Sequence, residues 1–171
     1  DGQRIRAKTL IFATGYELPK GVPSKGHKIT STFALATKPQ KKNLWPEQCL
    51  IWEASDPYLY MRTTLDGRVI CGGEDEDFSD EEKRDALLKK KIATLSRKLG
   101  KLFPKLDTSL ALAWTASFGE SATGLPSIGR VPGMRHCWAA LGYGGNGITY
   151  SRIAADVIRA ALTGCEDPDA D

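Results

Sequence analysis

The sequence lacks the features that mark membrane, secreted and metal-binding proteins. It has no run of about 18 apolar residues that could span a bilayer, and no basic-then-apolar leader at its start. Only two histidines occur, and no Cys-x-x-Cys pair, so neither a zinc site nor a redox dithiol is indicated. We therefore expect a soluble, cytoplasmic protein without a metal. Its four cysteines are expected to be buried free thiols: Cys49, Cys71, Cys137 and Cys165.

The sequence also lacks a strong net charge. Its 24 lysines and arginines against 21 acidic residues give +3, a balance that does not call for nucleic acid or an anionic membrane. No internal repeat or low-complexity segment occurs. Hydrophobic residues make up 41% of the chain, enough to bury a core. The composition is that of a globular protein.

Charge is segregated around one predicted helix, over residues 79–103. Ser79 and Glu82 have the spacing of a capping box, and Pro104 ends the pattern. Acidic residues crowd its start and basic residues its middle and end, which suits the helix dipole. One apolar stripe at helical spacing follows: Leu88, Ile92, Leu95, Leu99 and Leu102. The segment therefore predicts an amphipathic helix that covers a sheet.

Short β-type runs surround that helix. Asp66-Gly67 between two alternating runs is a strong hairpin signal, so an antiparallel sheet is predicted within residues 28–73. Residues 4–13 alternate and then become wholly apolar, which predicts the second strand of a hairpin followed by a strand buried on both faces. The partners of these strands are absent, so we expect a fragment of a longer protein. The expected strands cover residues 28–38, 49–54, 58–63, 68–73, 110–116 and 137–141.

A glycine cluster precedes the last predicted helix. Four glycines fall between Gly142 and Gly147, and unpaired N–H groups at a helix start attract an anionic or electron-rich group. The pattern is not the dinucleotide fingerprint, because the next acidic residue, Asp156, lies inside the helix. A tight strand-to-helix connection without a ligand is the alternative.

Three segments carry a common signature: Tyr58–Glu74, Phe118–Gly129 and Gly142–Ser151. Together they resemble the C-terminal half of the FAD-dependent amine and amino-acid oxidoreductases, the family of D-amino-acid oxidase, glycine oxidase, sarcosine oxidase and the D-amino-acid dehydrogenases. The resemblance implies an α+β fold, with an antiparallel substrate-domain sheet covered by a helix and partial remnants of an α/β, Rossmann-like FAD-binding domain. It divides the chain into an FAD-domain remnant (1–20), a substrate-binding domain (21–115) and a return to the FAD-binding domain (116–171).

The resemblance also implies FAD as cofactor. Noncovalent binding is expected, because residues 106–130 lack the cysteine that covalent members use. In several members an arginine stands where this chain has Leu125. The helix start would stabilise charge on the reduced flavin. The expected cofactor-binding residues are Thr14, Gly15, Gly124, Leu125, Pro126, Gly142, Gly144, Gly145, Asn146, Gly147, Ile148 and Thr149.

Tyr60 and Arg62 are the expected catalytic residues. They stand two apart and share one strand face, where the arginine could pair with a substrate carboxylate and the tyrosine hydroxyl could add a hydrogen bond. An outward-facing pair that serves solubility is the alternative. No acid–base motif competes with them, because His27 and His136 fall in loop-like contexts and are expected at the surface.

The function implied by the resemblance is oxidation of a small amine or amino acid by hydride transfer to flavin N5. Two alternatives stay open: a flavoprotein dehydrogenase for a hydroxy acid or polyol, and a non-enzymatic module whose basic helix face meets an acidic partner. Without a dinucleotide-binding strand, these 171 residues alone are expected to bind FAD weakly, to be inactive, and to self-associate through exposed sheet edges.

Overall fold

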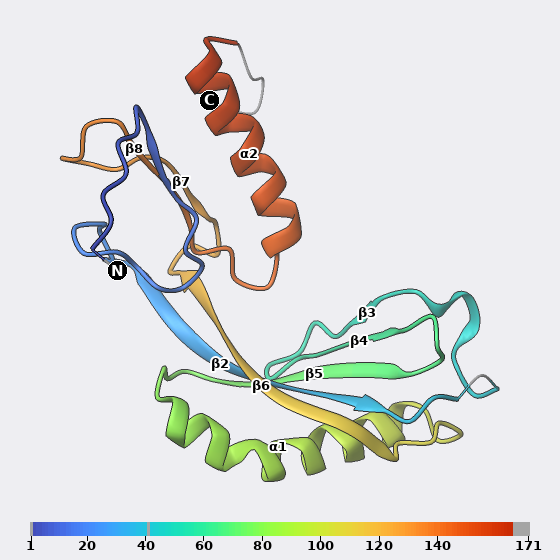
Figure 1. The fold of residues 1–171 in the computed structure, drawn as a ribbon. Helices are drawn as coiled ribbons and strands as arrows, with labels where there is room; N and C mark the ends of the chain where they lie inside the picture. The colour runs from blue at the N-terminus through green and yellow to red at the C-terminus, as the bar shows by residue number, and fades with distance from the viewer. Residues whose placement is uncertain (1, 41, 166–171) are drawn as a thin grey trace. The chain divides into compact units, whose positions relative to one another are not determined.

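The computed structural model describes residues 2–40 and 42–165. Contacts divide the chain into two compact units, unit 1 (residues 1–29 and 118–171) and unit 2 (residues 30–117). Both helices and strands are present, so the α+β fold expected from the sequence is confirmed (Figure 1). Neither helix is long and apolar enough to cross a membrane, as far as the described residues show.

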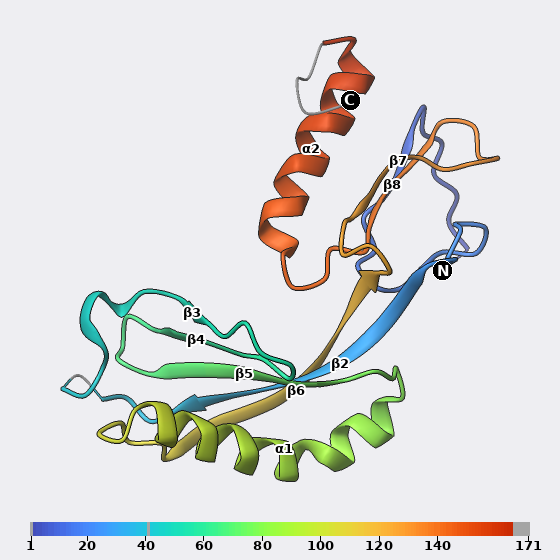
Figure 2. The same ribbon diagram turned by 180° about the vertical axis from the view of Figure 1, so that it is seen from behind.

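Unit 2 is built on a five-stranded sheet in the order β3-β4-β5-β2-β6. Helix α1 (Glu81–Leu102) lies along one face of this sheet, as Figures 1 and 2 show from opposite sides. The strands are β2 (His27–Thr37), β3 (Ile51–Trp52), β4 (Leu59–Thr63), β5 (Val69–Glu76) and β6 (Leu110–Ser121). A short 3-10 turn, η1, covers Pro46–Gln48. The core between sheet and helix includes Phe33, Leu35, Leu59, Met61, Leu95 and Leu99, all 1% exposed or less.

The N-cap of helix α1 lies one residue later than the sequence predicted. Asp80 is the N-cap, and its side chain accepts a hydrogen bond from the backbone N–H of Lys83 at 2.9 Å. The predicted capping box of Ser79 and Glu82 is therefore wrong. Both Ser79 and Asp80 are good N-cap residue types, and the sequence alone does not rank two such neighbours. The predicted apolar stripe is correct at its centre, although Leu102 is 46% exposed at the end.

A β-bulge interrupts β5 beside β2. Phe33 pairs with Gly73 and Ser31 pairs with Glu76, so one residue of β2 opposes two residues of β5. Gly73 has φ +131° and Glu74 has φ +57°, backbone conformations that carry the extra residue. Downstream of the bulge, acidic side chains of β5 reach α1. The ion pairs that join them to the helix are Glu74 with Lys98, and Glu74 and Glu76 with Lys91.

Unit 1 contains a three-stranded sheet, β1-β8-β7, with helix α2 (Gly147–Thr163) packed against it. Strands β1 (Leu10–Phe12) and β8 (Cys137–Leu141) are parallel, and β7 (Ser127–Arg130) is antiparallel to β8. The buried contacts of α2 are made by Ala154 and Ile158 against Trp138 and Ala140.

Strand β1 is shorter and more exposed than the sequence predicted. Leu10 is 48% exposed and Ile11 is 46% exposed, so within the described residues this strand is not covered on both faces. The reason is topological: β1 is an edge strand that pairs with β8 alone within the described residues. Such an unpaired edge is the kind of surface that can drive self-association.

The cysteines are free, but only one of them is buried. Cys71 is buried, Cys137 is half-buried, and Cys49 and Cys165 are exposed, so the expectation of four buried thiols is wrong. Burial raises the pKa of the Cys71 thiol to about 12. That thiol therefore stays protonated at neutral pH and behaves as a small core residue.

Candidate cofactor and substrate sites

Three glycine-bearing segments meet at one edge of the sheet in unit 1. Phe12 of β1 pairs in parallel with Ala139 of β8, so both strands end at the same edge. Beyond that edge β1 leads to Thr14 and Gly15, and β8 leads to the loop that begins at Gly142. Ser127, the first residue of β7, pairs with Leu141, which brings residues 124–126 to the same place. The carboxyl ends of parallel strands are where open α/β sheets bind ligands.

Gly142 packs closely against the His27 side chain. Its φ is +73°, and a Cβ there would lie 2.8 Å from Cδ2 and 3.0 Å from Nε2 of the His27 imidazole. Nε2 of His27 lies 3.1 Å from Oγ of Ser127, while its Nδ1 is buried without a hydrogen-bond partner among the described residues. The expectation of a surface His27 is therefore wrong, whereas His136 is exposed as expected.

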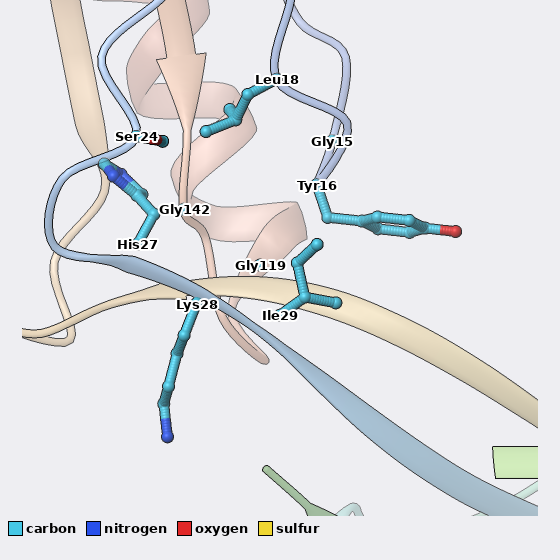
Figure 3. Close-up of a pocket in the computed structure, with 9 residues that line it drawn as sticks. All are labelled: Gly15, Tyr16, Leu18, Ser24, His27, Lys28, Ile29, Gly119 and Gly142. Carbon is cyan, nitrogen blue, oxygen red and sulfur yellow. The ribbon is translucent and has the colours of Figure 1, made fainter. Parts of the chain in front are cut away.

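A cavity of about 230 Å³ opens beside Gly15 and Gly142. Gly15, Gly119 and Gly142 contribute backbone to its wall, and Leu18 and His27 contribute side chains (Figure 3). Lys28 also lines it, but its side chain points away in Figure 3 and its ammonium group pairs with Glu120 at 3.3 Å. The cavity is smaller than a typical ligand pocket, so it can take only part of a large cofactor.

The N-terminus of α2 is open toward a ligand. Asn146 occupies the N-cap position, but its side chain makes no capping hydrogen bond and the first turn holds no acidic residue. Nothing lies within 4 Å of a Cβ placed on Gly145, and Ile148 is 91% exposed. Within the described part of the chain, no side chain therefore caps the N–H groups of the first turn, and these groups suit an electron-rich ring edge or an anion. The residues present fit a flavin in this respect.

The other predicted cofactor residues differ in their exposure and in the hydrogen bonds that they already make. The hydroxyl of Thr14 donates a hydrogen bond to the carbonyl of Glu17 within its own turn. Leu125 is 61% exposed, and its carbonyl accepts a 2.6 Å hydrogen bond from the Ser121 hydroxyl. Gly144 donates its N–H to the carbonyl of Gly119 at 2.9 Å, which ties the glycine loop to the end of β6.

Tyr60 and Arg62 lie on β4 in unit 2. The Tyr60 ring lies over Gly72, where a Cβ would come 2.3 Å from the phenolic oxygen. Burial, then the nearby Asp75 carboxylate, raises the pKa of Tyr60, so its hydroxyl remains a hydrogen-bond donor at neutral pH. Arg62 is exposed, and its guanidinium group donates a long, 3.5 Å hydrogen bond to the carbonyl of Thr63. Its guanidinium group is available to a carboxylate.

Sequence reasoning missed His27, Asp75 and the aromatic residues around Tyr60. The rings of Trp52 and Tyr58 lie 5.9 Å apart, and those of Tyr58 and Tyr60 lie 6.3 Å apart. Two adjacent glycines before an acidic run could have signalled the bulge that places Asp75. The position of His27 has no comparable signal, because it depends on contacts with residues about 100 positions away in sequence.

Comparison with known proteins places the chain in a family. The model of the FAD dependent oxidoreductase family matches residues 1–161. No curated protein matches the chain in sequence at a significant level.

Solved structures of similar fold are numerous. Iminodiacetate oxidase from Chelativorans sp. BNC1 matches with a TM-score of 0.80 at 18% identity, over 98% of this chain and 45% of that one. Glycine oxidase from Geobacillus kaustophilus matches with 0.72 at 14% identity, over 95% and 43%. Fructosamine oxidase (Amadoriase II) from Aspergillus fumigatus matches with 0.74 at 14%, over 99% and 44%. The chain thus spans less than half the length of each of these structures.

Proposed function

Because the chain belongs to the FAD dependent oxidoreductase family, we propose that it is the C-terminal part of a flavoenzyme that binds FAD noncovalently and oxidises a small amine or amino acid. The observation that carries this proposal is the meeting of residues 14–15, 124–126 and 142–149 at one sheet edge, beside an uncapped helix start. The names of the structural neighbours, which include glycine, iminodiacetate and fructosamine oxidases, favour an amine donor.

The residues of unit 1 would hold the cofactor. Backbone N–H groups at Gly147, Ile148 and Thr149 would donate to an electron-rich edge, and the glycines before them leave the backbone accessible. Bound FAD would supply the acceptor for the electrons taken from the substrate. Ser127 and His27 would keep the Gly142 backbone fixed, so that little reorganisation accompanies binding.

The residues of unit 2 would hold the substrate. Arg62 would bind a carboxylate through a charge-assisted, bidentate interaction, and the protonated Tyr60 hydroxyl would donate a further hydrogen bond. Orientation of this kind is what a hydride donor needs from the protein. Neither residue has to accept a proton from the amine if the substrate arrives with a neutral nitrogen.

The basic-surface alternative loses part of its support. Of the basic residues predicted on α1, Lys91 and Lys98 pair with Glu74 and Glu76 inside unit 2. Their charges therefore serve the contact between helix and sheet. The exposed members are fewer than the sequence suggested: Lys89, Lys90, Arg97 and Lys101.

The proposed function is tested by anaerobic absorbance titration of the protein from the complete reading frame. The protein is purified and titrated with D-, L- and N-methyl amino acids and with simple amines. Bleaching of a flavin spectrum by one of these classes is the expected result. A protein that neither contains nor takes up flavin would refute the cofactor assignment, and a flavin bleached by hydroxy acids or polyols alone would refute the amine assignment.

Replacing Arg62 by methionine is expected to weaken substrate binding selectively. Loss of a charge-assisted pair should raise KM for a carboxylate-bearing substrate by about 10- to 100-fold. The measurement is steady-state kinetics of the complete flavoprotein. Arg97→Met, which removes the same charge from the exposed face of α1, is the matched control and should leave KM within about twofold. Equal KM values in both variants would place Arg62 outside the substrate site.

A further inference from the structure

Three oxygen-bearing side chains gather on the face of the unit 2 sheet opposite α1. Phe33 lies in the core beneath α1, so its neighbour Thr32 lies on the other face. Tyr60 lies on that face, over Gly72. The bulge brings Asp75 there as well, close enough that its carboxylate raises the pKa of the Tyr60 phenol. Thr32, Tyr60 and Asp75 are called the oxygen cluster below.

The oxygen cluster has hydrogen-bonding capacity that the described residues do not use. Thr32 is 9% exposed, and its Oγ1 is buried without a hydrogen-bond partner. Oδ1 of Asp75 is likewise buried and unpartnered. The Thr32 hydroxyl is near enough to Tyr60 to lower its pKa, yet the two do not form a hydrogen bond of good geometry. Buried polar atoms normally have partners, so two unpartnered oxygens near the same tyrosine indicate a missing donor.

We propose that the oxygen cluster binds a primary ammonium group of the substrate. Such a group carries three N–H donors and one positive charge, which match three oxygens of which one belongs to a carboxylate. A divalent metal fits less well, because a single carboxylate leaves its charge uncompensated and the described residues contain no group of three or more His, Cys, Asp and Glu that could hold one. The orphan atoms would gain their partners from the ligand.

The surface beside the oxygen cluster suits the aliphatic stem of such a ligand. Trp52 pairs with Tyr60 across β3 and β4, and the rings of Trp52, Tyr58 and Tyr60 form a row. Trp52 is 62% exposed, so this row presents aromatic surface to an incoming molecule. Aromatic faces also attract a cation electrostatically. The row and the oxygen cluster together fit a chain of methylene groups that ends in an ammonium.

This inference rests on the proposed function and narrows its substrate class. An ammonium held by a carboxylate has no lone pair on nitrogen and therefore cannot be the nitrogen that is oxidised. The substrate would carry two basic nitrogens, one neutral and reacting and the other charged and bound by the oxygen cluster. Diamines and diamino acids meet this description, and Arg62, two residues from Tyr60, could hold the carboxylate of a diamino acid.

The first experiment measures cation binding without turnover. The complete flavoprotein is titrated calorimetrically with 1-aminobutane hydrochloride at neutral pH. Asp75→Asn should raise Kd by about 10- to 100-fold and Thr32→Val by about 3- to 10-fold, because each removes one acceptor and keeps the shape. Asp77→Asn, which removes the same charge from an exposed position just after β5, is the matched control. Equal Kd values in all four proteins, or no binding at all, would overturn the proposal.

The second experiment tests substrate selectivity. Lysine and norleucine have side chains of the same length and differ at the terminal ammonium, so the ratio of their kcat/KM values isolates that group. L-Lysine is compared with L-norleucine, and D-lysine with D-norleucine. The ratio should favour lysine by about 10-fold or more and should fall toward one in Asp75→Asn. A ratio that the substitution leaves unchanged would contradict the inference.

The two experiments separate this inference from the proposed function. If amines bleach the flavin but neither Kd nor the selectivity ratio depends on Asp75, only the ammonium site is wrong. If 1-aminobutane binds in an Asp75-dependent way but no amine bleaches a flavin, the oxidase function is wrong and the cation-binding site stands. Circular dichroism of each variant shows whether it is folded. If Asp75→Asn does not fold, Thr32→Val still tests the ammonium site.

Discussion

Gly142→Ala is expected to deprive the complete protein of most of its FAD. A Cβ at this position would lie 2.8 Å from the His27 ring, and φ of +73° is unfavourable for alanine. The backbone strain and the overlap together should cost about 2 to 4 kcal/mol. Relief requires His27 to move away from Ser127, which shifts the loop that leads into α2. We expect FAD affinity to fall at least about tenfold, measured by fluorescence titration of the apoprotein.

Gly145→Ala is the matched control for this prediction. It adds the same methyl group to the same loop, but nothing lies within 4 Å of its Cβ and its φ is not in the left-handed region. FAD affinity should stay within about threefold of the wild-type value. If Gly142→Ala and Gly145→Ala have the same affinity as the wild type, then the Gly142 backbone does not position the cofactor site.

Gly73→Ala is expected to destabilise unit 2 strongly. A Cβ at Gly73 would lie 2.2 Å from the carbonyl oxygen of Tyr58, which belongs to the backbone and cannot rotate away. The φ of +131° is also one that residues with a side chain rarely adopt. Separation of β4 from β5 should lower the free energy of unfolding by about 3 to 5 kcal/mol.

Urea unfolding followed by tryptophan fluorescence measures this loss. Trp45 stacks on Phe103 at 5.0 Å in the core of unit 2 and reports on it. Gly26→Ala is the control for left-handed strain outside unit 2: its φ is +82°, no atom lies within 4 Å of its Cβ, and it lies in unit 1, so the unfolding of unit 2 should stay close to the wild type. Similar midpoints for Gly73→Ala and Gly26→Ala would show that β4 and β5 can separate at this point without loss.

The elements that the sequence predicted well are those with a long or local signal. Helix α1 was found from a stripe of apolar residues over several turns, and the hairpin of β4 and β5 from Asp66-Gly67. Strand β7 was missed, because Ser127–Arg130 lies in a glycine- and proline-bearing stretch and becomes a strand only by pairing with β8. Strand β6 extends to Ser121, beyond the predicted end at Ala116, for the same reason: its partners lie far away in sequence.

The candidate sites divide in the same way. The glycine loop could be predicted because glycine has no side chain, so the sequence itself shows where the backbone is accessible. The convergence of residues 14–15, 124–126 and 142–149 at one edge follows from strand register, which residue type does not encode. The oxygen cluster depends on the β5 bulge, which sets the side chain of β5 that lies on the same face as Tyr60. A register error of one residue would put a different side chain there.

The β5 bulge also has a consequence for how relatives of different chain length can be compared. Gly73 and Glu76 are three positions apart, yet both pair with residues of β2 that face the helix, Phe33 and Ser31. An odd spacing on one face means that the strand has absorbed one inserted residue. A relative one residue shorter here would keep every later side chain on its present face. An alignment of such relatives should therefore place a one-residue gap at Gly73 or Glu74, and the residue matched to Asp75 would still face Tyr60.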